Sequence, residues 1–243
     1  MILGDSVTIL SPHLDDAVLS LGAAIARATR SGAAVEVVTV FAGDPDASEP
    51  SGAWDARSGF RTCGEAIRTR RSEDLRACRL LGASTRWLPF ADLQYEPPLR
   101  SEVARALTPI LAAASTILTP GFPMTNPDHR VVTELALDLA PAAARLGVYL
   151  EQPYDWWSVA QRLSRPRLPA SLRFRRPPPA PDESALGTPL EWAPLAASAS
   201  DIGRKYRAAH VYASQVGNLG HLAVSRILLR ERRRGGEYVA WIR

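Results

Sequence analysis

Three polar residues interrupt an apolar stretch near the N-terminus, in the segment ILSPHLDDAVLSLG at residues 9–22. His13, Asp15 and Asp16 stand where a short β-branched strand should turn into a helix. Two interpretations are open. Aspartates near a helix N-terminus can cap its free backbone N–H groups, whereas an imidazole and carboxylates so close in sequence can bind a metal ion.

A second polar cluster, in the segment MTNPDHRVV at residues 124–132, favours the metal. Asp128 and His129 also follow a predicted strand and open a predicted helix. If the strands take the order 3-2-1-4-5, the first and fourth are neighbours, and the turns after them face each other across one crevice. Two of the four histidines in the chain would then meet there.

Imidazole and carboxylate ligands without a thiolate suit a catalytic zinc ion, which takes three protein ligands and leaves one position open for water. His13 and Asp16 are spaced to reach one ion, which leaves Asp15 free to act as a general base. Such an ion lowers the pKa of a water molecule and polarises the carbonyl that the water attacks. Zinc is inferred here from ligand type, and another divalent ion stays open.

Strand and helix patterns alternate through the first 150 residues or so, with a loop predicted over residues 43–62. The predicted strands cover residues 6–11, 33–43, 85–90, 115–120 and 147–153. The predicted helices cover residues 16–32, 63–81, 100–114 and 127–146. This alternation predicts an α/β fold with a Rossmann-like, doubly wound, mostly parallel sheet.

The 243 residues suit a single domain. We expect a Rossmann-like core at residues 1–153 and a C-terminal extension at residues 154–243 that completes the site. Within the extension, residues 165–182 are rich in proline and should wrap the surface, and residues 199–215 return to a helical pattern.

Charge and composition argue against nucleic acid as a partner. The net charge is +4, but 28 of the 29 basic residues are arginine, and the densest basic run, RERRRGG at residues 230–236, has no interleaved aromatic residue. Cys63 and Cys78 have neither metal-site nor disulfide-framework spacing, so we expect reduced thiols. The N-terminus lacks signal-peptide features and the apolar residues 17–41 contain arginines, which predicts a cytoplasmic protein without a membrane span.

Several segments resemble the LmbE/PIG-L family of zinc-dependent N-deacetylases. PHLDDAVLSLG and NPDHRVV are similar to its signature motifs PHPDDE and HPDH. RRSEDLRACRLLGA resembles its R-x-x-E helix, YLEQPY its Y-x-E-x-x-P-Y strand end, and KYRAAHVYASQV its late K…SQ helix. The resemblance spans about residues 6–216.

The resemblance implies roles for individual residues. His13, Asp16 and His129 would bind Zn²⁺, and Asp15 would be the general base that later returns its proton to the leaving amine. Asp128 would orient its neighbours through hydrogen bonds.

On the substrate side, the resemblance implies that Arg70 contacts the substrate. Tyr212 falls at the family's His-or-Tyr position before the Ser-Gln pair, where it could assist the reaction or make a structural hydrogen bond. Trp54, with Phe60, Trp156 and Trp157, could form an aromatic wall against a sugar, or could only pack. His210 and His221 are expected on helix surfaces.

Asn126 is the departure from the family that bears most on function, since Leu14 and Ala17, the other two, can leave the ligands intact. It occupies the first position of HPDH, where the family has a histidine thought to stabilise the oxyanion or to protonate the leaving group. An amide can donate a hydrogen bond but cannot carry a proton. Losing one such contribution costs on the order of 10² to 10³ in rate, so we expect slowed or shifted activity.

The leading hypothesis is a deacetylase acting on an N-acetyl amino sugar or another N-acyl natural product, as in antibiotic biosynthesis. A metal-binding but catalytically silent protein that binds a ligand or partner is the alternative that Asn126 keeps open. A nucleotide-binding domain is disfavoured because the turn SPHLDD lacks the G-x-G-x-x-G that lets a pyrophosphate approach. Assembly into a homo-oligomer stays open.

Overall fold

The computed structural model describes residues 3–43, 47–92, 95, 97–122, 126–153, 190–219 and 237–242. The described strands are β1 (Ser6–Ser11), β2 (Ala34–Thr39), β3 (Ser84–Trp87), β4 (Thr116–Phe122), β5 (Arg145–Leu150), β6 (Trp192–Leu195) and β7 (Glu237–Trp241). The described helices are α1 (Asp16–Arg30), α2 (Ala53–Arg57), α3 (Cys63–Leu81), α4 (Arg100–Ala112), α5 (Pro127–Leu139), α7 (Ala199–Ala209) and α8 (Ala213–Leu219).

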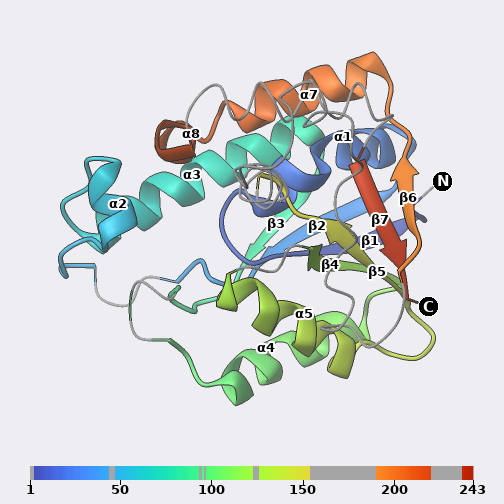
Figure 1. Cartoon of the computed structure of the whole chain (residues 1–243), viewed down its shortest axis with the longest axis horizontal. Helices are drawn as coiled ribbons and strands as arrows, with labels where there is room; N and C mark the ends of the chain where they lie inside the picture. The colour runs from blue at the N-terminus through green and yellow to red at the C-terminus, as the bar shows by residue number, and fades with distance from the viewer. Residues whose placement is uncertain are drawn as a thin grey trace, which may run out of the picture.

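Within the described part of the chain, the strands form one sheet of order β3-β2-β1-β4-β5-β7-β6 (Figure 1). The strands from β3 to β5 pair in parallel, and β7 pairs antiparallel with both β5 and β6. The predicted α/β fold with the strand order 3-2-1-4-5 is confirmed. The C-terminal part adds two antiparallel strands to the β5 edge.

Helices cover both faces of this sheet (Figure 1): α1, α3 and α7 pack together on one face, and α4 and α5 pack on the other. Successive side chains of a strand point to opposite faces. In β1, Val7 and Ile9 therefore join the core with α1, α3 and α7, whereas Leu10 joins the core with α4 and α5. This burial on both sides explains the continuous apolar runs in the parallel strands.

Helix α3 has the predicted bounds because its ends are capped. The Thr62 side chain accepts the Glu65 backbone N–H at 3.2 Å, and Gly82 adopts the left-handed conformation (φ 81°) just past the end. The predicted end near Leu146 of the helix that begins at Pro127 is wrong. Helix α5 stops at Leu139, since Ala140 is extended, as a residue before proline prefers.

Two further predictions of local structure need correction. Residues 43–62 are not all loop, because they contain the short helix α2. The helix expected over residues 199–215 is divided into α7 and α8. Between them the backbone N–H groups of Val211 and Tyr212 bond to carbonyls three residues back, a tight turn that directs Tyr212 inward.

A buried ion pair fixes the C-terminal part to α1. Lys205 Nζ donates to Glu237 Oε1 at 2.7 Å, and the same carboxylate accepts the backbone N–H groups of Ala23 and Ala24. Gly22 provides the room, since a Cβ there would lie 2.7 Å from Lys205 Cγ. The only lysine of the chain thus holds α7 and β7 against the helix that begins at the polar turn.

Some predictions concern residues that the structure leaves undescribed. The proline-rich segment of residues 165–182, the basic run at residues 230–236, Trp156, Trp157 and His221 lie outside the described residues. Cys63 and Cys78 are described, and both are buried free thiols, as predicted. No helix in the described ranges is long and apolar enough to cross a membrane.

Candidate metal centre

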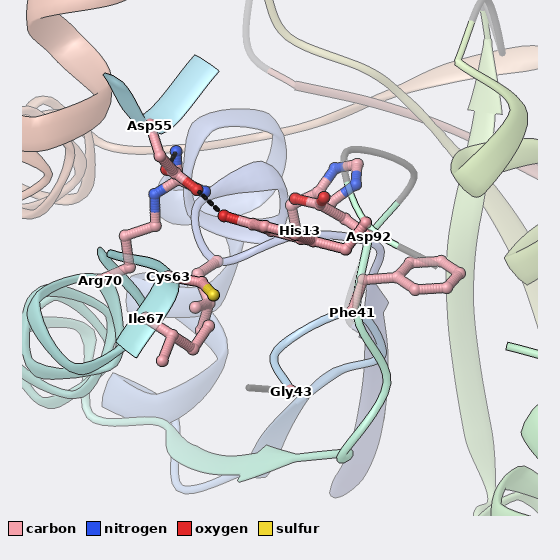
Figure 2. A pocket seen from close by; sticks show the side chains of 10 residues that line it. His13, Phe41, Gly43, Asp55, Cys63, Ile67, Arg70 and Asp92 are labelled. Carbon is pink, nitrogen blue, oxygen red and sulfur yellow. Dashed lines mark hydrogen bonds and ion pairs between the residues drawn. The ribbon is translucent and has the colours of Figure 1, made fainter. Parts of the chain in front are cut away.

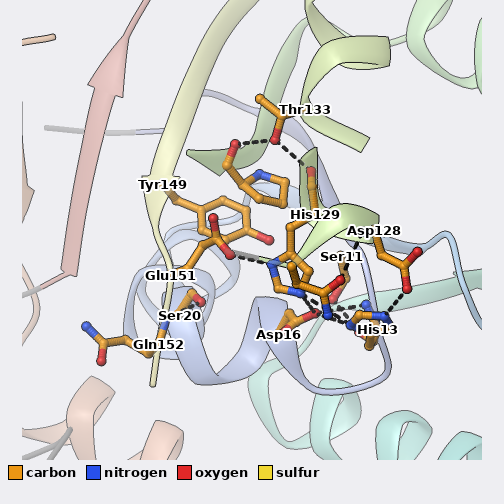
Figure 3. A network of polar contacts seen from close by, with 12 residues as sticks. Ser11, His13, Asp16, Ser20, Asp128, His129, Thr133, Tyr149, Glu151 and Gln152 are labelled. Atoms are coloured by element: carbon orange, nitrogen blue, oxygen red, sulfur yellow. Dashed lines mark hydrogen bonds and ion pairs between the residues drawn. The ribbon is translucent and has the colours of Figure 1, made fainter. Parts of the chain in front are cut away.

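The parallel pairing of β1 with β4 brings the two polar turns together at the carboxyl ends of these strands (Figure 3). Ser11 holds the first turn, because its hydroxyl donates to the His13 carbonyl at 2.7 Å and accepts the Ala17 N–H at 3.0 Å. Thr133 ties the second turn to the sheet through hydrogen bonds to the carbonyls of Pro120 and His129. Both turns are therefore fixed by local hydrogen bonds.

Three potential ligand atoms meet between the turns. His13 Nδ1 lies 3.2 Å from Asp16 Oδ2, and His129 Nε2 lies 3.3 Å from both of these atoms. The same three residues are the described group whose geometry could hold a metal ion. Ligands predicted from two segments more than a hundred residues apart thus contribute the three donor atoms of one triangle.

Each imidazole donates its other N–H to a carboxylate. His13 Nε2 contacts Asp128 Oδ2 at 2.9 Å, and His129 Nδ1 contacts Glu151 Oε2 (Figure 3). Such pairs fix the tautomer and the orientation of a metal-binding histidine. They leave His13 Nδ1 and His129 Nε2 as the ring nitrogens that face the centre of the triangle.

The carboxylates strongly affect the titration of this cluster. Burial alone would lower the pKa of His13, but Asp128 and Asp16 raise it to about 9. Burial likewise opposes a raised pKa at His129, yet Asp16 and Glu151 raise it well above its usual range. Burial would raise the pKa of Asp16, but the two histidines outweigh it and hold that pKa well below its usual range.

Asp15 lies beside the triangle and is 8% exposed. It is the N-cap residue of α1, but its side chain makes no capping hydrogen bond, so the structure does not bear out capping by this residue. Burial and then the Asp16 carboxylate raise the pKa of Asp15 well above its usual range, and the positive groups of His13 and Arg70 offset this only in part. A carboxyl group of raised pKa is suited to acid–base chemistry near neutral pH.

Asn126 is the N-cap of α5. Its carboxamide oxygen accepts the Asp128 backbone N–H at 2.9 Å. Asparagine is among the preferred residues at this position. The amide oxygen is therefore used to begin the helix, and the NH₂ group is the part that can donate to a ligand.

The residues predicted to contact substrate have different surroundings in the structure. Arg70 lines a pocket next to His13. Tyr212 is fully buried and its hydroxyl donates to Asp74 at 2.8 Å, so the structural alternative describes it better. Trp54 Nε1 donates to Gln215 Oε1 at 2.9 Å, which ties α2 to α8. His210 is partly exposed at the end of α7, as expected.

Sequence reasoning missed the role of Glu151. This residue follows the apolar run of β5, is 2% exposed, and lies against His129. A carboxylate directly after a buried strand that neighbours β4 is the signal that could have found it. Asp55, which pairs with Arg70, was also missed, and no spacing in the sequence relates it to the two motifs.

Comparisons with known proteins identify the family of this chain. Residues 8–140 match the family described as GlcNAc-PI de-N-acetylase (PIG-L). No sequence match was found among curated proteins.

Solved structures share the fold over almost the whole chain. The A40926 pseudoaglycone deacetylase Dbv21 is 27% identical with a TM-score of 0.79, over 98% of this chain and 96% of that one. The zinc-inhibited form of the teicoplanin deacetylase Orf2 is 21% identical with a TM-score of 0.73, over 97% of each chain. The hydratase GalB from Pseudomonas putida is 18% identical with a TM-score of 0.60, over 98% and 95%. The family match covers more than half of the chain, which therefore belongs to the GlcNAc-PI de-N-acetylase (PIG-L) family.

Proposed function

We propose that the chain is a metal-dependent N-deacetylase that removes the acetyl group from an N-acetyl amino sugar carried by a larger natural product. The observation that carries this proposal is the triangle of donor atoms from His13, Asp16 and His129. Family membership and the likeness to Dbv21 support the reaction and the substrate class. A cytoplasmic enzyme that acts on a small molecule is part of the same proposal.

The triangle fits zinc by size as well as by ligand type. Zinc–ligand bonds of about 2.0–2.1 Å in a tetrahedron require ligand atoms about 3.3 Å apart. The three edges here are 3.2, 3.3 and 3.3 Å. Three protein ligands would leave the fourth position open for water or substrate, which is the pattern of catalytic zinc sites.

When bound, the ion would supply Lewis-acid chemistry, lowering the pKa of water and polarising the amide carbonyl. Asp15 would take a proton from the water molecule that attacks the carbonyl carbon. It would return that proton to the amide nitrogen as the C–N bond breaks, giving acetate and a free amine. Asp128 and Glu151 would keep the two imidazoles oriented, and the Asn126 NH₂ group would donate to the developing oxyanion.

Zinc binding should release protons and should weaken as the pH falls from 9 to 6. The pKa of His13 near 9 means that this ring is protonated in the metal-free site at neutral pH and must lose its proton before Nδ1 can bind. Titration calorimetry in buffers of different ionisation enthalpy measures both effects. Replacing the partly exposed His210 by alanine should change neither. Zinc binding that is independent of pH would contradict this account.

Asp15→Asn should leave zinc bound and greatly reduce acetate release. The amide keeps the shape of the side chain but cannot accept a proton, and loss of a general base costs on the order of 10² to 10⁴ in rate. Metal analysis and acetate release from a panel of N-acetyl amino sugars and their glycosides measure the two effects. Asp138→Asn, on the exposed side of α5, is the control for charge.

Full activity in the Asp15→Asn variant would refute the assigned role. Stoichiometric zinc without turnover by the wild type across the whole panel would favour the silent, ligand-binding alternative.

Asn126→His should raise kcat on an N-acetyl sugar by about 10²-fold, because the imidazolium can both donate to the oxyanion and deliver a proton. The same change should lower the free energy of unfolding by about 1 kcal/mol, since it removes the cap of α5. Asn126→Asp is the matched control, because it keeps a capping oxygen but cannot donate. It should retain stability and lose activity. Unchanged kcat in Asn126→His would refute the role given to this position.

A further inference from the structure

The pocket beside His13 contains a charged pair that the two motifs do not include. Arg70 from α3 and Asp55 from α2 lie against each other in this pocket (Figure 2). Arg70 is 9% exposed, and Asp55 is its ion-pair partner among the described residues. Nη2 of Arg70 lies against Oδ1 of Asp55, and both Nε and Nη2 are buried atoms without a hydrogen bond of good geometry within the described chain. The guanidinium thus lines the pocket with its charge balanced by the Asp55 carboxylate.

Asp55 is held firmly in this place. The Tyr95 hydroxyl donates to its Oδ2 at 3.0 Å and accepts the Gly52 backbone N–H at 3.0 Å. The Asp55 carbonyl accepts the N–H groups of Ser58 and Phe60, which close the turn after α2. The carboxylate is therefore fixed by its own segment and by Tyr95 before any ligand arrives, so little ordering is left for binding.

Helix α8 also fixes the position of α2 through hydrogen bonds. The Ser58 hydroxyl donates to the Ser214 carbonyl at 2.7 Å, and Asn218 Nδ2 donates to the Trp54 carbonyl and to Ser58 Oγ. Trp54 itself donates to Gln215. A helix of five residues has little stability alone, so these contacts place Asp55 against Arg70 and keep it there.

This pairing determines which ligand groups the pocket can accept. An unpaired buried arginine is a strong site for a carboxylate or phosphate. Here Asp55 already supplies that carboxylate, and a second anion would meet it as a like charge. A neutral group with hydroxyls meets no such repulsion, and its oxygens can accept a hydrogen bond from the guanidinium.

We propose that Asp55 is a specificity-determining residue that makes this pocket select a neutral, hydroxyl-bearing sugar over an acidic one. The selection rests on the proposed deacetylase function, because the sugar in question is the one that carries the N-acetyl group at the neighbouring metal centre.

The test compares two substrates that differ in one group: 4-nitrophenyl N-acetyl-β-glucosaminide and its 6-carboxylate, the corresponding uronide. The wild type should prefer the neutral glycoside in kcat/KM. Asp55→Asn should change the ratio by at least about tenfold towards the uronide, through a gain on the uronide. Asp138→Asn removes the same charge from an exposed site and should leave the ratio unchanged.

Two outcomes would overturn the proposal: a wild type that prefers the uronide, or an Asp55→Asn variant that is folded by circular dichroism and keeps the wild-type ratio. The first outcome is measured on the wild type alone. If the wild type turns over neither glycoside, that result counts against the proposed function and not against the selectivity. Calorimetry of the two intact glycosides with the wild type and with Asp55→Asn then tests the selectivity. The wild type should bind the neutral glycoside more tightly than the uronide, and Asp55→Asn should gain affinity for the uronide.

Discussion

The parallel pairing of β1 with β4 is the constraint on which the candidate site depends. Val7 of β1 lies opposite Thr116 of β4, so the turns that follow these strands end at the same edge of the sheet. Burying histidines and carboxylates at such an edge is costly unless they satisfy one another. Asp128 and Glu151 do this for the two imidazoles, and the same contacts fix the remaining ring nitrogens around one point.

Much of this arrangement was predictable because it is encoded locally. Strand and helix periodicity predicted a parallel, doubly wound sheet. The common strand order of such sheets, with the rule that ligands bind at the carboxyl ends of strands, placed the two turns together. The end of α5 was predicted too late, near Leu146, although the proline after Ala140 is a stop signal in the sequence. The contacts of Tyr212 and Asp55 were not predictable, because their partners, Asp74 and Arg70, are defined by how α8 and α2 pack on α3. Contacts between elements that irregular chain segments connect leave no periodic pattern in the sequence from which they could be predicted.

The fold alone does not choose the reaction, since a hydratase shares it. What argues for deacetylation here is the combination of family membership, a zinc-sized triangle and a buried carboxyl group with a raised pKa beside it. Asn126 shows how one position can serve structure and chemistry at once. Its oxygen begins α5, and only its NH₂ group is left for the role that a histidine has in the family motif.

X-ray absorption at the zinc edge, recorded on the zinc-loaded protein, tests the central claim most directly. The account predicts one zinc per chain with only nitrogen and oxygen neighbours at about 2.0–2.1 Å, and with the outer-shell scattering of two imidazoles. Replacing His13 by alanine should remove one of these imidazoles. A sulfur neighbour at about 2.3 Å, or a spectrum unchanged by that replacement, would place the metal elsewhere and contradict the account.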